Sequence, residues 1–324
     1  MDSVRFGIIG CGGIARRAFL PAVAALDEVH VMAVASQNIE KARRCASETG
    51  CEAEETYDSL LNRSDLDAVY IATPTGMHTE WAVKAAQRGL HVLCEKSLAP
   101  SLAEVELIIQ AGEKNNVSVL EGFAYQFHSQ HSFVRNMVQE GQIGQPVVMQ
   151  AWFGFPPLDP QNFRYDKNLG GGALLDAGAY TVHIARRFYG REPVQVFSTL
   201  DVSSSGVDIH GSVLLDFGLG QTAHLAFGFD NMYKNSYQIW GTEGTLSLSR
   251  AFSIPPKLPP VLVLERQDFK EEITLPPSDQ FVAEINHFCK GISDTETRIM
   301  WVTDARNQAR VMRAIQDCAQ TTYK

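Results

Sequence analysis

The stretch VRFGIIGCGGIA, residues 4–15, decides the fold of the first part of the chain. Residues 4–9 form a short apolar run that is typical of a buried strand, and a cluster of glycines follows it directly. From residue 15 to residue 26 the apolar side chains recur at helical spacing, with Pro21 as an early interruption that would kink the helix. The glycines therefore join a strand to a helix, which is the first half of a parallel βαβ unit.

Residues 10–15, GCGGIA, fit the pattern G-x-G-x-x-A in this strand-to-helix context. Gly10 permits a tight turn, Gly12 lets the backbone approach a pyrophosphate, and Ala15 allows close packing of helix on strand. The helix N-terminus would present free N–H groups and the positive end of its dipole to the phosphates. The motif predicts dinucleotide binding; the alternative is a glycine turn that serves packing only.

Strands and helices alternate up to about residue 122, which predicts an α/β Rossmann domain with a doubly wound parallel sheet over residues 1–122. Its expected strands are 29–35, 68–72, 91–94 and 117–120, and its expected helices are 39–49, 79–88 and 101–115. Residues 123–324 show runs with period-2 alternation at 147–153, 194–202, 207–217, 222–229, 237–240, 245–248, 261–265 and 272–275, and helical runs at 131–140, 173–189, 280–290 and 303–316. We expect this part to be an α+β domain for substrate binding and oligomerisation, with a large, mostly antiparallel sheet.

Composition is that of a soluble globular protein. Of the 324 residues 45% are hydrophobic and 20% are charged, and 28 Lys and Arg against 37 Asp and Glu give a net charge of −9. An acidic chain lacks the concentrated basic face that nucleic acid requires, and no apolar run reaches the roughly 18 residues of a membrane span. The six cysteines show no CxxC spacing, so we expect reduced thiols and a cytoplasmic protein. His128 and His131 have ligand-like spacing without a third ligand, and we expect no metal.

The end of the second strand selects the dinucleotide. An acidic residue there would accept hydrogen bonds from the adenosine 2′-hydroxyl and would repel a 2′-phosphate. This chain has Ala35-Ser36-Gln37-Asn38 instead, with Lys41 and two arginines just beyond. A hydroxyl, two amides and nearby cations favour NADP(H) over NAD(H). The alternative is that the basic residues form a solvated helix face, because no arginine stands directly beside Ser36.

Two further segments carry candidate chemistry. Glu95-Lys96 ends an expected strand on the ligand-binding edge of the sheet, where a lysine would reach a substrate beside the nicotinamide. Alone, such a pair is typical of surface charge. After the three glycines 170–172, a helix would place Asp176, Tyr180 and His183 at i, i+4 and i+7 on one face. The alternative is an amphipathic helix whose polar stripe faces water.

Together these pieces resemble the glucose-fructose oxidoreductase / inositol dehydrogenase / rhizopine-catabolism family over essentially the whole chain. The resemblance is carried by the glycine loop, Ala72-Thr73-Pro74 with His78, Glu95-Lys96, and GGGALLDAGAY at residues 170–180. It implies that Lys96 is a catalytic lysine and that Asp176 and Tyr180 face the substrate. The family usually has proline after the lysine, where this chain has Ser97.

Later segments resemble a narrower group, the nucleotide-sugar 3-ketoreductases of deoxysugar biosynthesis. These segments are residues 155–157, 163–165, 227–237, 250–256 and 265–268. The resemblance implies an oxidoreductase that uses NADPH to reduce the C3 keto group of a dTDP-linked deoxyhexose. We expect Tyr180 to donate the proton, the Lys96 ammonium to stabilise the tyrosinate and polarise the carbonyl, and Asp176 to orient Lys96 or bind a sugar hydroxyl. The sequence leaves open whether Lys96 or Tyr180 is the final donor, and the scheme requires both to converge on the bound cofactor.

The resemblance and the motifs together define the expected sites. Cofactor-binding residues are Gly10, Gly12, Gly13, Ile14, Ala15, Ser36, Gln37, Lys41, Thr73, Pro74, His78, Glu95, Lys96 and Arg164. Substrate-binding residues are Lys96, Arg164, Asp176, Tyr180, Tyr233 and Asn235. Two alternatives remain: an NADP-dependent pyranose or trans-dihydrodiol dehydrogenase acting on a free small molecule, and a non-catalytic dinucleotide-sensing regulator. We also expect a homo-oligomer, dimer or tetramer, because an open apolar sheet face is costly to leave in water.

Overall fold

The computed structural model describes residues 3–323, and the chain folds into two units. The first unit comprises Met1–Phe123 with Phe281–Arg306, and the second comprises Ala124–Gln280 with Asn307–Lys324. The expected domains, 1–122 and 123–324, differ from these units, because residues 281–306 belong to the first. In this segment the Phe288 ring centroid lies 5.8 Å from that of Phe6, and the Ser118 hydroxyl donates to the Ile292 carbonyl at 3.0 Å. Contacts between residues so far apart in the chain have no local sequence signal.

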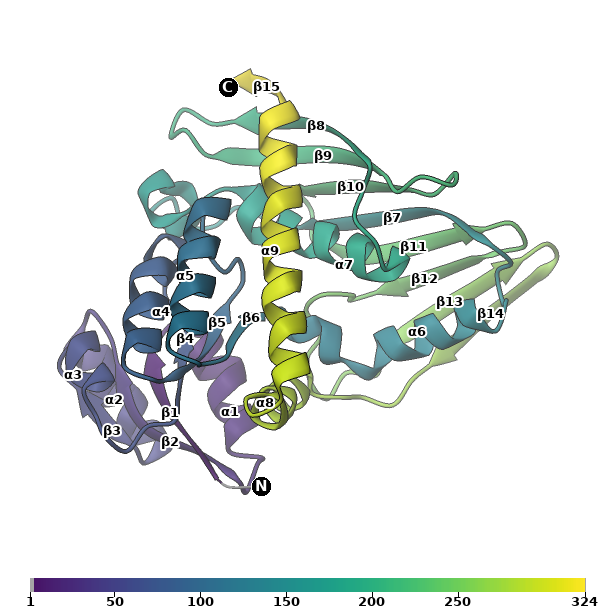
Figure 1. Ribbon diagram of the computed structural model, residues 1–324. Helices are drawn as coiled ribbons and strands as arrows, with labels where there is room; N and C mark the ends of the chain where they lie inside the picture. The colour runs from purple at the N-terminus through teal and green to yellow at the C-terminus, as the bar shows by residue number, and fades with distance from the viewer. Residues whose placement is uncertain (1–2, 324) are drawn as a thin grey trace. The chain divides into compact units, whose positions relative to one another are not determined.

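A six-stranded parallel sheet in the order β3-β2-β1-β4-β5-β6 forms the first unit (Figure 1). The central strands are apolar and buried, as expected of a parallel sheet with both faces covered. The doubly wound α/β prediction is therefore confirmed. The strands are β1 (Val4–Ile9), β2 (Val29–Ala35), β3 (Glu52–Glu54), β4 (Ala68–Ile71), β5 (His91–Glu95) and β6 (Val119–Gly122). The helices are η1 (Ala15–Phe19), α1 (Leu20–Val23), α2 (Ile39–Thr49), α3 (Tyr57–Leu61), η2 (Thr75–Met77), α4 (His78–Gln87), α5 (Leu102–Lys114), α8 (Gln280–Gly291) and the first half of α9 (Thr295–Cys318).

Polar side chains fix where several helices of this unit begin. The Ser101 hydroxyl accepts the Glu104 N–H at 3.3 Å and donates to the Glu104 carboxylate at 2.7 Å, at the expected start of α5. The Asn38 side chain accepts the backbone N–H of Glu40 at 2.9 Å and begins α2. The sequence did not predict β3 and α3, because these elements are only three and five residues long and show little periodicity.

The second unit contains a nine-stranded sheet in the order β14-β13-β12-β11-β7-β10-β9-β8-β15. Its neighbours are antiparallel except for the pairs β7–β10 and β8–β15, so the mostly antiparallel prediction is confirmed. The strands are β7 (Pro146–Gly154), β8 (Gln195–Val202), β9 (Asp208–Asp216), β10 (Thr222–Gly228), β11 (Lys234–Gly241), β12 (Thr245–Ser249), β13 (Val261–Arg266), β14 (Phe269–Thr274) and β15 (Gln320–Tyr323). The helices are η3 (Ala124–Phe127), α6 (Ser129–Gln139), η4 (Phe163–Tyr165), η5 (Lys167–Leu169), η6 (Leu174–Gly178), α7 (Ala179–Tyr189) and the second half of α9.

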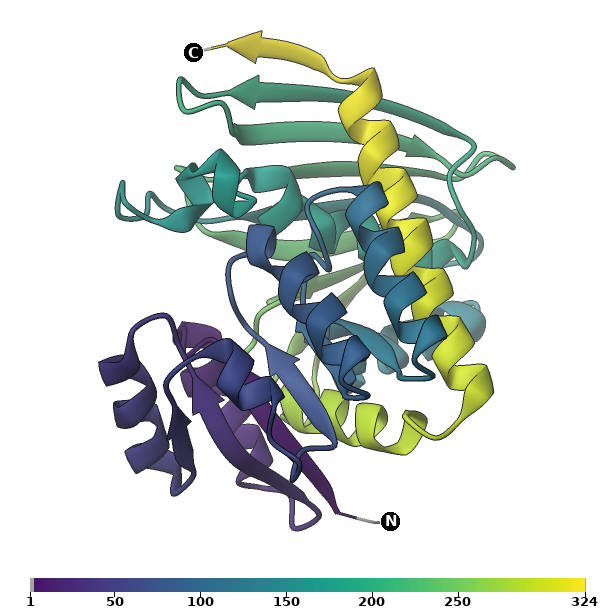
Figure 2. The same ribbon diagram turned by 60° about the vertical axis from the view of Figure 1, so that its left-hand side comes forward.

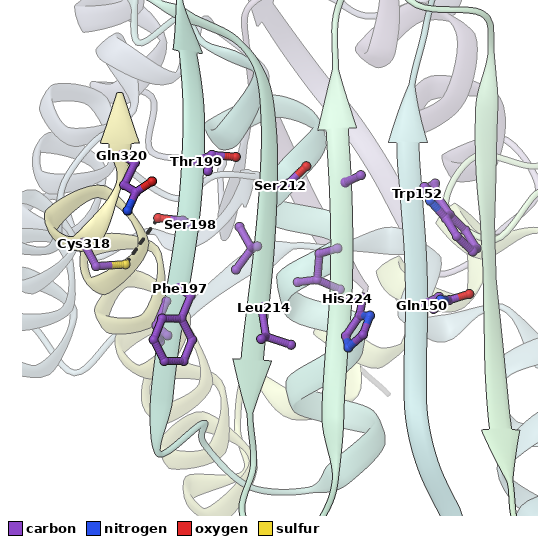
Figure 3. Close-up of a pocket in the computed structure, with 14 residues that line it drawn as sticks. Gln150, Trp152, Phe197, Ser198, Thr199, Ser212, Leu214, His224, Cys318 and Gln320 are labelled. Atoms are coloured by element: carbon purple, nitrogen blue, oxygen red, sulfur yellow. Dashed lines mark hydrogen bonds between the residues drawn. The ribbon is translucent and has the colours of Figure 1, made fainter. Parts of the chain in front are cut away.

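Helices cover one face of this second sheet (Figure 2). The Ser198 hydroxyl of β8 donates to the Ile315 carbonyl of α9 at 2.7 Å, and the Gln308 side chain of α9 donates to the Ala179 carbonyl of α7 at 3.0 Å. Side chains alternate along the strands, so Phe197 points to the opposite face beside Leu214 of β9 (Figure 3). We call this second surface, which also carries Gln150, Trp152, Thr199, Ser212, His224 and Ala226, the open face.

Candidate active site

The glycine loop has the geometry that its sequence predicts. Gly10 has a φ of +100°, and a Cβ there would lie 2.9 Å from the backbone of Ala72, so only glycine fits at this close approach of two strand ends. A Cβ on Gly12 would meet only the Ala72 carbonyl oxygen, at 3.6 Å, which is an ordinary contact. The chain itself therefore leaves the space above Gly12 open, as a ligand that approaches the backbone requires.

The helix after the loop differs from a regular α-helix. Residues Ala15–Phe19 form a π-helical turn, and only Leu20–Val23 are α-helical. Pro21 has no N–H to donate to the residue four positions earlier, so the hydrogen-bond ladder widens in front of it. The expected interruption by Pro21 thus occurs as a widened first turn.

The end of β2 presents polar groups without an acidic residue. Ser36 is half-buried, while Gln37 and Lys41 are exposed. The Asn38 side chain caps α2, and the Gln37 amide donates its backbone N–H to the Tyr57 hydroxyl at 3.2 Å. The Ser36 hydroxyl accepts the Asn38 N–H at 3.3 Å, and the Gln37 side-chain amide donates to the Met77 sulfur at 3.7 Å. Lys41 is exposed in the first turn of α2. The Arg43 guanidinium, by contrast, pairs with a neighbouring glutamate on α2 at 2.8 Å.

The loop after β4 carries an orphaned buried hydroxyl. Thr73 is buried, and its Oγ1 has no hydrogen-bond partner among the described residues. A buried hydroxyl without a partner is costly, so a ligand that bonds to it would be stabilised. The glycine cradle and this hydroxyl both lie at the carboxyl ends of adjacent strands β1 and β4, so the residues present fit a dinucleotide.

His78 joins two of these strand-end loops. Its ring nitrogens lie 2.8 Å from the Thr73 carbonyl oxygen and 2.9 Å from the Ser97 carbonyl oxygen, and the side chain is buried. Burial lowers the pKa of His78, and the hydrogen bonds to the two carbonyl oxygens oppose this shift. The structure therefore gives His78 a positioning role: it ties the loop after β4 to the segment that follows Lys96.

Glu95 and Lys96 end β5 with different surroundings. The buried Glu95 carboxylate accepts the Tyr70 hydroxyl hydrogen at 2.6 Å, whereas Lys96 is half-buried. The Lys96–Ser97 peptide bond is cis. The next residue, Leu98, donates its N–H to the buried Glu121 carboxylate at 2.9 Å. The strand end that carries Lys96 is thus fixed by side chains of β4 and β6 on either side.

In the second unit, Asp176 and Tyr180 lie together on the helix after the triple glycine. That helix begins with the π-helical turn η6 and continues as α7. The Asp176 carboxylate accepts two hydrogen bonds from the Arg164 guanidinium, from Nε at 2.5 Å and from Nη2 at 3.3 Å. Arg164 also interacts electrostatically with the Tyr180 hydroxyl. The structure therefore brings together three of the expected residues, Arg164, Asp176 and Tyr180.

Aromatic rings surround the Tyr180 side chain. The ring centroids of Phe153, Phe252 and Tyr125 lie 5.1, 5.6 and 5.6 Å from that of Tyr180. The Tyr125 hydroxyl lies 2.7 Å from Nδ1 of the buried His183. The polar stripe expected on this helix does not face water: Asp176 and Tyr180 are half-buried and His183 is buried.

Tyr233 and Asn235 belong to a neighbouring network. The Asn235 amide donates to the Tyr233 hydroxyl at 2.9 Å and to the Ser253 carbonyl at 3.1 Å, and its oxygen accepts the Phe252 N–H at 2.7 Å. Asn235 is buried, so its amide holds the segment that carries Phe252 against Tyr180. Tyr233 is exposed and keeps its hydroxyl near this network.

Sequence reasoning missed Tyr125, Phe153 and Phe252. Tyr125 and Phe153 lie in two different elements and Phe252 in a loop, and although residues 250–256 carry part of the resemblance, nothing in the sequence marks these three rings as neighbours of Tyr180. The expected pair His128 and His131 also has a structural explanation: His128 caps α6, and His131 lies 3.1 Å from the Tyr237 hydroxyl and 3.0 Å from the Ala251 carbonyl oxygen. Within residues 3–323 no group of three His, Cys, Asp or Glu side chains could hold a metal ion.

Comparison with known proteins agrees with this geometry. Residues 4–123 match the model of an oxidoreductase family with an NAD-binding Rossmann fold, and residues 131–247 match the GFO/IDH/MocA C-terminal domain. None of the helices in the described part of the chain is long and apolar enough to cross a membrane.

Individual relatives cover nearly the whole chain. A dTDP-3,4-didehydro-2,6-dideoxy-alpha-D-glucose 3-reductase from Saccharopolyspora spinosa is 39% identical over 89% of this chain and 87% of its own length. A D-xylose 1-dehydrogenase (NADP(+)) from Haloferax volcanii is 33% identical over 98% of this chain and 97% of its own. The crystal structure of a 3-ketoreductase from Actinomadura kijaniata, in complex with NADP and TDP-benzene, superposes with a TM-score of 0.96 at 35% identity and covers 100% of both chains. The chain is an oxidoreductase of the GFO/IDH/MocA family.

Proposed function

We propose that this protein is an NADP(H)-dependent oxidoreductase that reduces a keto group, at C3, of a dTDP-linked deoxysugar. The observation that carries the proposal is the cluster that Arg164 of η4 forms with Asp176 and Tyr180 of the helix after the triple glycine. Similar full-length proteins from Saccharopolyspora spinosa and Actinomadura kijaniata are named as reductases of this kind. A phenol beside a guanidinium–carboxylate pair suits a reaction in which a carbonyl oxygen gains a proton.

The dinucleotide that we propose is NADP(H). The open space above Gly12 and the orphaned Thr73 hydroxyl support a bound dinucleotide. The absence of an acidic side chain from residues 35–39, with the exposed Lys41 close behind in the sequence, supports a 2′-phosphate over a free 2′-hydroxyl. The Actinomadura kijaniata structure contains NADP.

The chemistry divides between cofactor and protein. When bound, the nicotinamide cofactor supplies the hydride. Tyr180 holds the proton that the substrate oxygen must gain, and the Arg164 guanidinium beside it favours the anionic form that remains. Asp176 holds Arg164 in place through two hydrogen bonds. The aromatic rings around Tyr180 exclude water and so strengthen these interactions.

Lys96 has a separate role in this proposal. Its ammonium polarises the substrate carbonyl and offsets the negative charge that develops on the oxygen. The anchoring of the β5 end by His78 and by the Glu95–Tyr70 hydrogen bond supports a fixed lysine position. In an alternative form of this scheme Lys96 donates the proton instead of Tyr180, and the kinetics of single-site variants distinguish the two.

Purified protein tests the proposal directly. With NADPH and a dTDP-linked 3-keto-deoxyhexose, the NADPH absorbance should decline only when both are present. Failure of this substrate together with turnover of a free aldopentose and NADP+ would favour the second candidate, a free-sugar dehydrogenase, for which the D-xylose relative is the specific support. Addition of dTDP separates the two, because it should inhibit only a nucleotide-sugar enzyme. A regulator without activity would need neither Lys96, Asp176 nor Tyr180, and all three are present.

We further propose that the protein forms a homo-oligomer through the open face and is cytoplasmic. On this face Phe197 is 55% and Leu214 36% exposed, and Trp240 of β11 is 61% exposed. Burial of such apolar area contributes about 25 cal/mol per Å². All six cysteines are free thiols, as is typical of proteins in a reducing compartment. Light scattering gives the oligomeric mass, and a monomer at micromolar concentration would contradict the first of these proposals.

A further inference from the structure

We propose that Asp208, at the start of β9, is a positioning residue that fixes the N-terminus of the helix carrying Asp176 and Tyr180. This inference rests on the proposed function, because it assigns Asp208 a role in the reaction through these two residues. Asp208 lies 32 positions beyond Asp176 in the chain, and it is not among the residues that the sequence analysis expected at a cofactor or substrate site.

The Asp208 carboxylate bonds directly to the start of η6. Its Oδ2 accepts the Leu174 N–H at 2.6 Å, and the Ala173 N–H is a second backbone donor to the same carboxylate. The first N–H groups of a helix have no partner within the helix, so they need an outside acceptor. Asp208 therefore performs across the fold the task that an N-cap residue performs locally.

The helix has no cap of its own. Ala173 precedes η6 and makes no side-chain capping bond, and Gly178 precedes α7 and makes none either. The neighbouring segment has three glycines, a sequence without a polar side chain that could accept a hydrogen bond. The Asp208 carboxylate is thus the side-chain acceptor that the structure provides for these backbone donors.

Close approaches at the helix start explain two of the three glycines. Gly172 has a φ of +118°, and a Cβ there would collide with Oδ1 of Asp208. A Cβ on Gly171 would lie 2.8 Å from the carbonyl oxygen of Asp166. The Gly172 N–H also donates to the Arg164 carbonyl at 3.0 Å. Glycine is required here because Asp208 and the 164–166 segment approach the helix start from two sides.

This arrangement makes the position of Tyr180 depend on Asp208. The π-helical turn η6 closes through the bond from the Ala179 N–H to the Leu174 carbonyl, and the N–H of the same Leu174 is held by Asp208. Asp176 belongs to η6, and Arg164 of η4 is tied to the start of that helix because its carbonyl accepts the Gly172 N–H. Displacement of the helix start would move the carboxylate and the phenol together. A misplacement of about 1 Å can cost a factor of about 100 in rate.

The pKa of Asp208 reflects both its burial and its contacts with the helix start. Burial raises this pKa to about 6, while the N–H groups of Leu174 and Ala173 oppose the rise. Above pH 7 the group is therefore ionised, and an ionised carboxylate is the stronger acceptor for backbone N–H groups.

Three variants test the inference. Asp208→Ala removes both carboxylate oxygens, whereas Asp208→Asn keeps one carbonyl oxygen that can accept the Leu174 N–H. The matched control is Asp216→Ala at the other end of β9, where the carboxylate accepts the Gly218 N–H at 2.7 Å and serves only a turn. Hydrogen exchange and steady-state kinetics are measured on all three.

The expected result is faster exchange of the amides at residues 173–174 in Asp208→Ala and not in Asp216→Ala. In addition, kcat should fall at least about tenfold in Asp208→Ala with the KM for NADPH unchanged, and Asp208→Asn should recover most of the loss. If Asp208→Ala does not fold, Asp208→Asn must still have a kcat that is measurably lower than that of the wild type.

Other results would overturn the inference. Unchanged hydrogen exchange at residues 173–174 in Asp208→Ala would refute the capping contact. Faster exchange in Asp208→Ala together with a kcat equal to that of Asp216→Ala would refute the positioning role. Absence of turnover in the wild type would refute the proposed function, and the exchange measurement would still decide the cap.

Discussion

Replacement of Asp176 by asparagine removes a charge from a two-pronged ion pair without changing the shape of the side chain. In the wild type the Asp176 carboxylate accepts from both Nε and Nη2 of Arg164, and the two side chains are 16% and 28% exposed. Asparagine has one acceptor oxygen, so it cannot hold both nitrogens of the guanidinium. Arg164 would lose its anionic partner and with it its fixed position beside Tyr180.

The magnitude follows from the strength of such bonds. A hydrogen bond to a charged group contributes about 1.5–3 kcal/mol, and partial exposure moves the value towards the lower end of that range. If this energy holds the groups that act in the transition state, kcat/KM for the keto sugar should fall by roughly 10- to 150-fold. NADPH affinity should remain close to that of the wild type, because the glycine loop is untouched.

Glu192→Gln is the matched control for this experiment. Glu192 binds Arg186 through the same two-pronged geometry, at 2.6 and 2.8 Å, within the same unit. Both variants should lower the melting temperature, and only Asp176→Asn should lower kcat/KM, measured from NADPH oxidation with the nucleotide sugar. The reasoning is refuted if Asp176→Asn retains kcat/KM within about twofold of the wild type, or if both variants lose activity equally.

Three further predictions concern the cofactor loop, acid stability and assembly. Gly12→Ala should leave the melting temperature unchanged, because a Cβ fits there at 3.6 Å, yet should weaken NADPH binding at least about tenfold in a titration; unchanged affinity would contradict the role of this glycine. Burial lowers the pKa of His131 to about 3, so between pH 6.5 and pH 3 the imidazole binds a proton only in the unfolded chain. The free energy of unfolding should therefore fall with decreasing pH, by about 2 kcal/mol at pH 5. Denaturant unfolding of His131→Gln should show a smaller fall. Leu214→Asp on the open face should reduce the mass in light scattering, whereas Leu107→Asp, at a more exposed site on α5, should not; equal masses for all three proteins would exclude the open face as the interface.

Local patterns predicted much of the fold. The glycine loop, the helix start at residue 101 and the alternating strands beyond residue 123 each carry their signal in a short local pattern, and the structure places them as expected. The assignment of residues 281–306 differed, because it depends on packing of Phe288 against Phe6, which are far apart in the chain. The helix after Gly172 was predicted, but the contact of its start with Asp208 was not, because the two partners lie 34 positions apart in the chain.

The candidate site shows the same division. Lys96, Asp176 and Tyr180 could be predicted as site residues because they belong to contiguous motifs. Arg164 was expected on resemblance alone, and its pairing with Asp176 is a contact that no spacing rule gives. Asn235 was expected to bind substrate, whereas its amide is engaged by Ser253 and Phe252. Such contacts form only after distant segments fold together, so their partners cannot be deduced from periodicity.

A single-turnover experiment on Tyr180→Phe and Lys96→Ala tests the central claim most directly. Each variant is loaded with NADPH and mixed with the dTDP-linked keto sugar, and cofactor oxidation is followed by stopped flow. We predict that both variants bind NADPH as the wild type does, and that each oxidises it at least about 100-fold more slowly, because each has lost a group that serves the carbonyl oxygen. Oxidation by either variant at the wild-type rate would contradict the role that we assign to that residue.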